Sequence, residues 1–273
     1  MQPILQTKIF VAKCINALRG LFRNGRVSFI RTIWLNFRIL PFRQAIHLPI
    51  YIRGKVIFRT TNRGKLIIDA PIKRGIINIG GYGGSAPTSI YTEFDLTDGT
   101  LTLRQNTLIR SGCKFLVFNG GSVDIGADCK ILNNVCISAE TSVVIEHDCR
   151  LTHEVQIFDT SFHFMVSDDG IVRRNCSPIR IGHHSWLANR VTISKGVTLP
   201  PFTIVGQNTL ITKTPNIEEG CIIAGNPPHI IHKGIRRIYS FREECFLKNY
   251  FAQHPEEMIY KYSTIPPHIY DYD

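Results

Sequence analysis

A histidine and an aspartate lie close together in the segment IFDTSFH, residues 157–163. An imidazole titrates near neutral pH, so His163 could take a proton from a hydroxyl group. A carboxylate beside it, here Asp159, could fix which ring nitrogen carries the proton. The pair therefore predicts a general base. A histidine beside a loop is also often structural or solvated, so the spacing alone leaves that interpretation open.

A six-residue repeat must position this pair. From residue 181 to 225 an aliphatic side chain recurs every six positions, and a compact side chain follows four residues after each of the first seven. The aliphatic positions are Ile181, Leu187, Ile193, Leu199, Val205, Ile211, Ile217 and Ile223, and the compact ones are Ser185, Val191, Val197, Thr203, Thr209, Pro215 and Cys221. A period of six fits neither an α-helix nor an alternating strand. It indicates an all-β solenoid, a parallel β-helix in which three hexads make one triangular coil.

The repeat continues upstream, with longer offsets between coils. Three earlier sets are Leu103, Ile109 and Phe115; Ile125, Ile131 and Ile137; and Ile145, Leu151 and Ile157. It stops after Ile157 and resumes at Ile181, so we expect residues 164–178 to leave the solenoid as a loop. Loops on a rigid scaffold commonly carry function, and His163 lies where this loop begins.

Three regions follow from this pattern. Residues 1–60 form a basic, partly helical N-terminal region, residues 61–225 the β-helix with its loop, and residues 226–273 a turn, helices and a tail. We expect N-terminal helices over 4–22 and 27–40, and a C-terminal helix from a capping box at Ser240 to about Phe251. A second short helix is expected from His254, and the C-terminal aromatic side chains are expected to pack against the solenoid. The N-terminal helices would cover the open first coil, or residues 1–45 would contact a membrane surface; the two interpretations are compatible.

The composition restricts the partners. A net charge of +11 and a pI near 9.4 predict an anionic partner, such as a phosphorylated cofactor, nucleic acid or a membrane. No nucleic-acid motif is present, so we expect no nucleic-acid partner. Four of the eight cysteines, Cys113, Cys129, Cys149 and Cys221, fall on compact interior positions and are expected to pack there. Without a signal-peptide core or a long apolar segment, we expect a cytoplasmic protein, peripheral at the inner face of the membrane if the N-terminal region binds it.

Several segments carry a resemblance to a known family. The repeat, IFDTSFH, IGHHSWLANRVTISKGV, VGQNTLITKTP and IIAGNPPHII resemble the hexapeptide-repeat acyltransferases, especially the O-acetyltransferases of capsular polysaccharide and lipopolysaccharide. The resemblance is dense from about 103 to 233. It implies a left-handed β-helix, a homotrimer with active sites between neighbouring solenoids, and direct transfer of an acetyl group from acetyl-CoA to a sugar hydroxyl without a metal. An aminosugar amine is the alternative acceptor.

The resemblance also implies roles for individual residues. His163 matches the base of the family, in a variant of the D-T-D-F-H motif where Ser161 replaces the second aspartate, which leaves Asp159 as the candidate to orient the base. The residues that match cofactor positions are Trp186, the backbone at Ala188 and Asn189, Gly206 and Lys213. Lys233 and Arg236 follow within a cluster of basic residues, and we expect that cluster to bind the phosphates of CoA.

Two other classes of function remain open. A metal-dependent protein like the γ-class carbonic anhydrases would use His147, His153, His183 and His184. Because His147 and His183 each follow a repeat residue by two positions, they are expected to stack on consecutive coils, but two stacked histidines fall short of a tetrahedral set. In a noncatalytic scaffold, His163 would be incidental.

Overall fold

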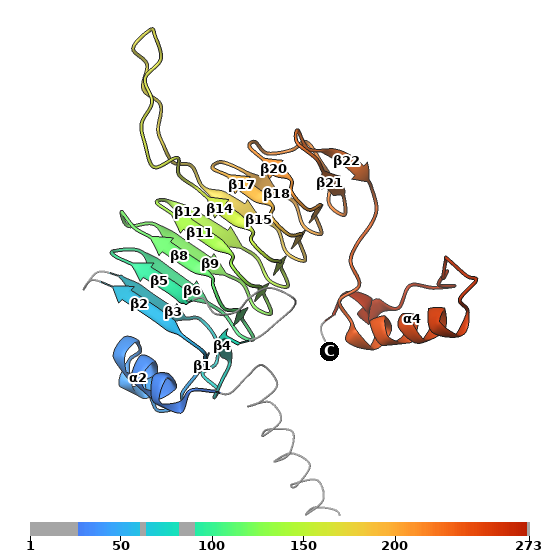
Figure 1. Cartoon of the computed structure of the whole chain (residues 1–273), viewed down its shortest axis with the longest axis horizontal. Coiled ribbons are helices and arrows are strands. Elements are labelled where there is room, and N and C mark those ends of the chain that lie inside the picture. Colours follow the sequence, from blue (N-terminus) through green and yellow to red (C-terminus); the bar gives the residue numbers. More distant parts are fainter. Residues whose placement is uncertain (1–26, 61–63, 82–90, 272–273) are drawn as a thin grey trace, which may run out of the picture.

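Short parallel strands wind into a left-handed β-helix with three sheets, as the six-residue repeat predicts (Figure 1). The computed structural model describes residues 27–60, 64–81 and 91–271; the helix expected over 4–22 lies outside them. The first sheet contains β1 (Ile50–Arg53), β4 (Ile77–Gly80), β7 (Leu108–Ile109), β10 (Lys130–Ile131), β13 (Arg150–Leu151), β16 (Trp186–Leu187), β19 (Ile204–Val205), β21 (Ile222–Ala224) and an antiparallel β22 (His229–His232). The second contains β2 (Val56–Thr60), β5 (Thr92–Leu96), β8 (Lys114–Val117), β11 (Cys136–Ala139), β14 (Gln156–Phe158), β17 (Thr192–Ser194) and β20 (Leu210–Ile211). The third contains β3 (Lys65–Ile68), β6 (Thr100–Leu103), β9 (Ser122–Ile125), β12 (Ser142–Ile145), β15 (Ile179–Ile181) and β18 (Thr198–Leu199).

The core consists of side chains stacked in register along each sheet. In the second sheet Phe115, Ile137 and Ile157 pair with one another on successive coils, and all three are fully buried. The four cysteines on compact positions are buried too, and burial raises the pKa of Cys113 to about 12. These thiols are therefore packing groups, as expected.

The β-helix begins earlier than the expected boundary and lacks one expected strand near its C-terminal end. It begins at Ile50, before the expected boundary at residue 61, because β1 pairs in register with β4. At the other end the third sheet stops at β18, and Ile217 lies in no strand. Pro215, two residues before it, has no N–H to donate to a ladder, which accounts for the missing strand.

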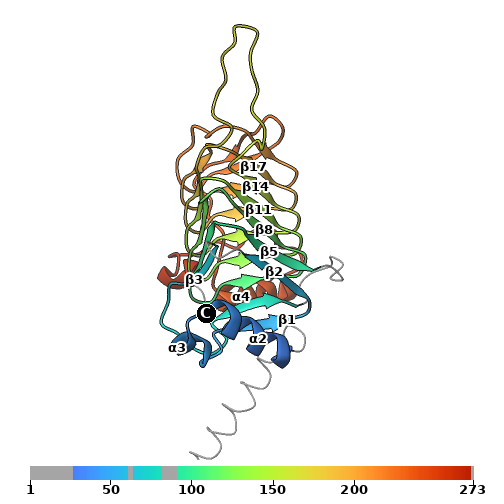
Figure 2. The same cartoon turned by 90° about the vertical axis from the view of Figure 1, so that its left-hand side faces the viewer.

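Two short helices, α2 (Phe29–Ile39) and α3 (Phe42–Ala45), cover the first coil. Figure 2 shows both helices at the end of the solenoid where β1 lies. The Asn36 side chain donates to the Ile50 carbonyl at 2.8 Å and accepts from the Ile50 N–H at 3.1 Å. Thr32 Oγ1 accepts from the Ile52 N–H at 3.0 Å. Helix α2 thus satisfies the edge of β1, which confirms the capping interpretation for this helix.

The C-terminal region differs in part from the expectation. Helix α4 (Phe241–Gln253) begins at the expected cap, where Ser240 Oγ accepts from the Glu243 N–H at 3.3 Å. The helix expected from His254 is not formed; a turn and a 3₁₀ helix, η1 (Pro267–Tyr270), follow instead. The expected packing of the C-terminal aromatic side chains on the solenoid is also wrong, since α4 buries no residue and its rings contact one another, as Tyr250 and Tyr260 do at 4.7 Å. In the described residues, no helix is long and apolar enough to cross a membrane.

Candidate active site

The large interruption of the repeat is a long loop that stands out from the solenoid between β14 and β15 (Figures 1 and 2). Its two arms pair at Thr160 and Cys176 and again at Val166 and Val172, so it begins a few residues earlier than the expected start at residue 164. The stem is held from both sides. Glu140 accepts from Thr160 Oγ1 at 2.6 Å and from Asn175 Nδ2 at 3.1 Å, and these hydrogen bonds, that of Thr160 first, hold its pKa below the ordinary value.

Lys195 holds the same stem from the following coil. Its Nζ donates to Ser161 Oγ at 3.1 Å, to the Asn175 carbonyl at 3.0 Å and to the Arg174 carbonyl at 3.4 Å. Ser161 stands where the matched motif has an aspartate, and here it accepts the lysine hydrogen bond that an aspartate would also accept. These hydrogen bonds therefore hold the stem of the loop against the solenoid.

Asp159 does not orient His163 in this chain. It is fully buried, and its carboxylate accepts three hydrogen bonds: from the Glu140 N–H at 2.8 Å, the Thr141 N–H at 2.8 Å and the Thr141 hydroxyl at 2.9 Å. These bonds join the loop stem to the neighbouring coil. The prediction that Asp159 orients the base is therefore replaced by a structural role.

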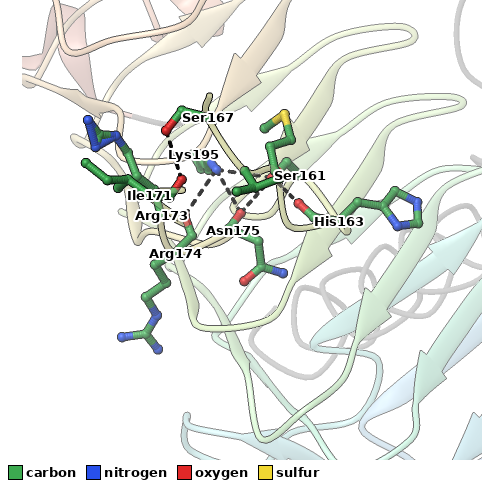
Figure 3. A pocket seen from close by; sticks show the side chains of 10 residues that line it. Ser161, His163, Ser167, Ile171, Arg173, Arg174, Asn175 and Lys195 are labelled. Atoms are coloured by element: carbon green, nitrogen blue, oxygen red, sulfur yellow. Dashed lines mark hydrogen bonds between the residues drawn. The ribbon is translucent and has the colours of Figure 1, made fainter. Parts of the chain in front are cut away.

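His163 is presented outward by a tight turn. Phe162, which precedes it, has a left-handed backbone with φ of 60°, a costly conformation for an aromatic residue. The ring of Phe162 stacks on Phe118 with centroids 6.1 Å apart, and its N–H donates to Thr160 Oγ1 at 2.9 Å. The imidazole of His163 is exposed, makes no hydrogen bond to the described part of the chain, and points away from Lys195 in Figure 3.

A hollow of about 390 Å³ lies beside this turn. Its lining includes His163, Lys195, Arg173 and Arg174 and no carboxylate (Figure 3). The hollow combines a free imidazole with three cations, which suits a hydroxyl substrate that carries negative charge nearby.

Three of the expected cofactor residues meet at a second hollow. Trp186, Ala188 and Asn189 line a space of about 310 Å³ with Thr152 and Gln207. The Ala188 N–H donates to the Val205 carbonyl at 2.9 Å as part of the coil ladder, so it is occupied. The Asn189 N–H has no acceptor among the described residues. Of the two expected amides, only that of Asn189 is free to bind a developing oxyanion.

Two further features shape this second hollow. The indole Nε1 of Trp186 is buried without a hydrogen-bond partner in the described structure, and the Arg237 guanidinium lies 4.9 Å from the Trp186 ring. Gly206 has a packing reason of its own: a Cβ there would lie 2.7 Å from the Cβ of Ala224 on the next coil. Its predicted role beside pantetheine stays a prediction.

The expected basic cluster divides into separate groups. Lys213 and His229 line a third hollow of about 550 Å³ at the C-terminal end of the solenoid. Lys233 is exposed and lines none of the three hollows. Arg236 is held by Glu219 and lies 4.8 Å from the Phe202 ring, so its guanidinium fixes the C-terminal segment. The prediction that Arg236 binds cofactor is therefore not supported by its surroundings.

Three of the four histidines of the alternative metal site come together, and His153 does not join them. His147 and His183 stack with centroids 4.8 Å apart, as the spacing predicts, and donor atoms of both lie within 4.8 Å of one on His184. Several of their nitrogens already have partners: His147 Nδ1 lies 2.9 Å from Asp148, and the Nδ1 atoms of His183 and His184 lie 3.0 Å apart. The rings of His147 and His183 are parallel, and the ring of His184 is nearly perpendicular to both. The cluster is thus better explained as an anchor for the C-terminal segment, whose Tyr270 carbonyl lies 3.2 Å from His184 Nε2.

Sequence reasoning missed Glu140 and Lys195, and it placed Arg237 only in the basic cluster expected to bind the phosphates of CoA. Lys195 could have been found, because it follows the repeat residue Ile193 by two positions and the loop leaves from the same corner one coil earlier. Arg237 lies outside the repeat, and only the folded C-terminal segment places it over Trp186.

No protein-family model matches this chain. A relative from Escherichia coli (strain K12), WbbJ, described as a lipopolysaccharide biosynthesis O-acetyl transferase, is 26% identical over 145 residues, which make up 50% of this chain and 73% of that protein. The crystal structure of the polySia specific acetyltransferase NeuO matches with a TM-score of 0.56 and 20% identity, over 79% of this chain and 87% of that one. A mutant of AntD, an N-acyltransferase from Bacillus cereus in complex with dTDP and coenzyme A, matches at 15% identity and a TM-score of 0.43, over 75% of this chain and 89% of that one. The likeness to NeuO shows that the two chains share a fold.

Proposed function

We propose that the chain is a hexapeptide-repeat acyltransferase and that it transfers an acetyl group from acetyl-CoA to a hydroxyl group of a sugar in a surface polysaccharide or its precursor. The observation that carries the proposal is the free imidazole of His163, held out on a clamped turn beside a cationic hollow. The E. coli relative with the described lipopolysaccharide role supports a saccharide acceptor.

The reaction needs no covalent enzyme intermediate. His163 takes the proton of the acceptor hydroxyl, and the resulting alkoxide attacks the thioester carbonyl of acetyl-CoA. A C–O bond forms, and the negative charge moves to the carbonyl oxygen, where the Asn189 N–H is a candidate donor. When the C–S bond breaks, the thiolate of CoA receives the proton from His163. The products are the acetyl ester and free CoA.

One chain does not assemble the whole site. The hollow beside His163, the one beside Trp186 and the one beside Lys213 share no lining residue. A homotrimer in which the His163 loop of one subunit faces the Trp186 hollow of its neighbour would bring them together, and Lys213 would then contact the CoA phosphates. An aminosugar amine, which the same base would serve, is the second candidate acceptor. Peripheral contact of residues 1–45 with the inner face of a membrane remains part of the proposal.

The test uses the full chain with labelled acetyl-CoA and polysaccharide precursors. We expect the His163→Ala variant to lose transfer by about 10²–10⁴-fold, the usual contribution of a general base, while its affinity for CoA is kept. His254→Ala is the matched control, because His254 lies at the end of α4 and contacts Tyr250. Wild-type turnover by His163→Ala would remove His163 as the base, and failure of the wild-type protein to bind acyl-CoA would favour a noncatalytic scaffold.

A further inference from the structure

Helix α2 turns polar residues toward the solenoid and large apolar residues toward solvent, which is the reverse of an ordinary surface helix. Its inward residues include the polar Thr32 and Asn36 together with Leu35, and these three satisfy and cover β1. Its large apolar side chains point the other way. The exposed apolar side chains of α2 and of the α3 turn, which we call the outer face, are Phe29, Ile30, Ile33, Trp34, Phe37, Phe42 and Ile46.

Capping the solenoid does not account for the outer face. Ile30 is 84% exposed and Phe42 is 72% exposed, and neither contributes to the bonds that close the first coil. Apolar side chains that contact only water do not add to the stability of the cap. A contiguous apolar surface of this kind marks a site of interaction. In the described residues no other element covers it (Figures 1 and 2).

The charge distribution says what kind of partner fits. Residues 1–68 contain thirteen lysines and arginines and no aspartate or glutamate. Residues 69–273 contain nineteen lysines and arginines against twenty-one acidic residues. The net charge of +11 therefore arises entirely in the first quarter of the chain, which includes the outer face.

Cations also flank the outer face directly. Arg38 and Arg43 lie on the same two helices and are exposed, and Arg31, also exposed, donates to the Gly54 carbonyl. The Arg38 guanidinium lies 4.7 Å from the ring of Trp34, so the two groups present an apolar body and a charged edge side by side. Tryptophan with arginine at the border of an apolar helix face is typical of a helix that lies in the interface of a bilayer.

We propose that the outer face of α2 and α3 binds the surface of an anionic lipid bilayer, with its apolar side chains at the boundary of the acyl chains and its arginines on the headgroup phosphates. The inference rests on the proposed membrane contact of residues 1–45, which it assigns to particular residues, and it does not depend on the proposed transferase activity. It gives the cap a second role, because the partly polar inward face leaves the seven apolar side chains of the outer face for the lipid. The His163 loop follows β14, which lies four strand spacings from β2 in the same sheet, or about 20 Å along the solenoid. A bilayer bound at the capped end would therefore not contact the loop.

The experiment measures sedimentation of the full chain with vesicles of phosphatidylcholine, alone or with about 30% phosphatidylglycerol. We expect binding to the anionic vesicles, weakened as salt rises from about 0.1 M to 0.5 M. The double variant Ile30→Gln, Trp34→Gln keeps the inward face of α2 and should bind at least about tenfold more weakly. The triple variant Arg31→Gln, Arg38→Gln, Arg43→Gln should lose the preference for the anionic lipid.

The matched control replaces apolar side chains that are equally exposed but lie in the C-terminal region, residues 226–273, where six lysines and arginines are balanced by six acidic residues. Met258→Gln, Ile259→Gln removes residues that are 87% and 80% exposed and should bind like the wild type. Equal binding of the wild type to both kinds of vesicle, or unchanged binding by the Ile30, Trp34 variant, would overturn the proposal. If the Ile30, Trp34 variant has a lower oligomer mass than the wild type in light scattering, the outer face binds a second copy of the chain. If iodide does not quench the fluorescence of Trp34 in the absence of vesicles, another part of the same chain covers the outer face. Either result also overturns the proposal.

Discussion

Within IFDTSFH, almost every side chain has a partner except the one proposed to do chemistry. Asp159 binds the neighbouring coil, Thr160 binds Glu140, Ser161 binds Lys195, and Phe162 stacks on Phe118. The strained backbone at Phe162 is held by these contacts and determines where His163 projects. The contacts of the other residues in this segment therefore fix the position from which the imidazole of His163 projects.

Lys195 should act as a positioning residue for His163. Lys195→Met removes three hydrogen bonds from the loop stem. Because a displacement of a catalytic group such as His163 by about 1 Å can cost about 10²-fold in rate, we expect kcat to fall by about 10–10²-fold. The KM for acetyl-CoA should be unchanged. Lys195→Arg should restore most of the rate, since a guanidinium can donate to the same oxygens, and Lys248→Met on α4 serves as control. A wild-type kcat for Lys195→Met in steady-state assays would show that the stem does not need this clamp.

Sequence analysis was more successful for site residues whose polar groups have no partner in the described chain than for those bound by hydrogen bonds or ion pairs. His163 and Asn189 are found with free groups, whereas the Ala188 amide, the Asp159 carboxylate and the Arg236 guanidinium are occupied by bonds within the chain. A motif gives the type of a side chain at a position, but its hydrogen bonds depend on the next coil or on a segment far along the chain. Those partners follow from the register of the folded solenoid.

At the scale of elements, the coils of the strict repeat were predicted well and the ends were not. From Leu103 to Val205 each aliphatic position named from the repeat is a buried interior residue, because a fixed period places it there. From Pro49 to about Thr102 the spacing is irregular, so the sequence indicates early coils there but not their register, and the boundary was set at residue 61. The packing of Tyr250 on Tyr260 instead of on the solenoid has no sequence signal, since an aromatic ring can be buried against either.

The cap formed by α2 should matter to stability through Asn36. Asn36→Leu leaves the N–H and the carbonyl of Ile50 without their buried partner, and each such group costs about 1–3 kcal/mol, so we expect a loss of about 2–6 kcal/mol. Urea unfolding followed by circular dichroism measures the change. Gln253→Leu, at an exposed helix end, is the control. A loss below about 1 kcal/mol for Asn36→Leu would mean that water replaces the bonds and that the cap is dispensable.

The C-terminal segment should loosen in acid through His184. Burial lowers the pKa of His184, opposed by Asp148, while His183 and His147 lower it further. The unfolded segment therefore takes up a proton below pH about 6.5 where the folded one does not, so its stability is full above that pH and falls as the pH drops below it. Hydrogen exchange of residues 236–271, corrected for intrinsic rates, should show less protection at pH 5.5 than at pH 7.5, and His184→Asn should remove the difference. Equal protection at both pH values in the wild type would contradict this account.

At the scale of the whole molecule, the loop tip carries apolar side chains that the described part of the chain leaves exposed. Phe164, Met165, Val166 and Val172 are all exposed on a loop that stands away from its own solenoid. Apolar side chains gathered in this way favour contact with another subunit. We expect a trimer with three times the chain mass of 31.0 kDa in light scattering, and a Met165→Asp, Val166→Asp variant that is smaller and inactive.

Complementation between inactive variants tests whether the site spans two subunits. Trp186→Ala and His163→Ala should each be inactive alone, because each removes one half of every site. In mixed trimers made from equal amounts, a site is intact when the Trp186→Ala subunit supplies His163 and its His163→Ala neighbour supplies Trp186, which random assembly gives in about a quarter of interfaces. Co-expressed and purified mixed trimers should therefore regain about a quarter of wild-type turnover. If they remain inactive while still trimeric, His163 and Trp186 act within the same chain, and the loop tip must be covered by something other than the neighbouring active site.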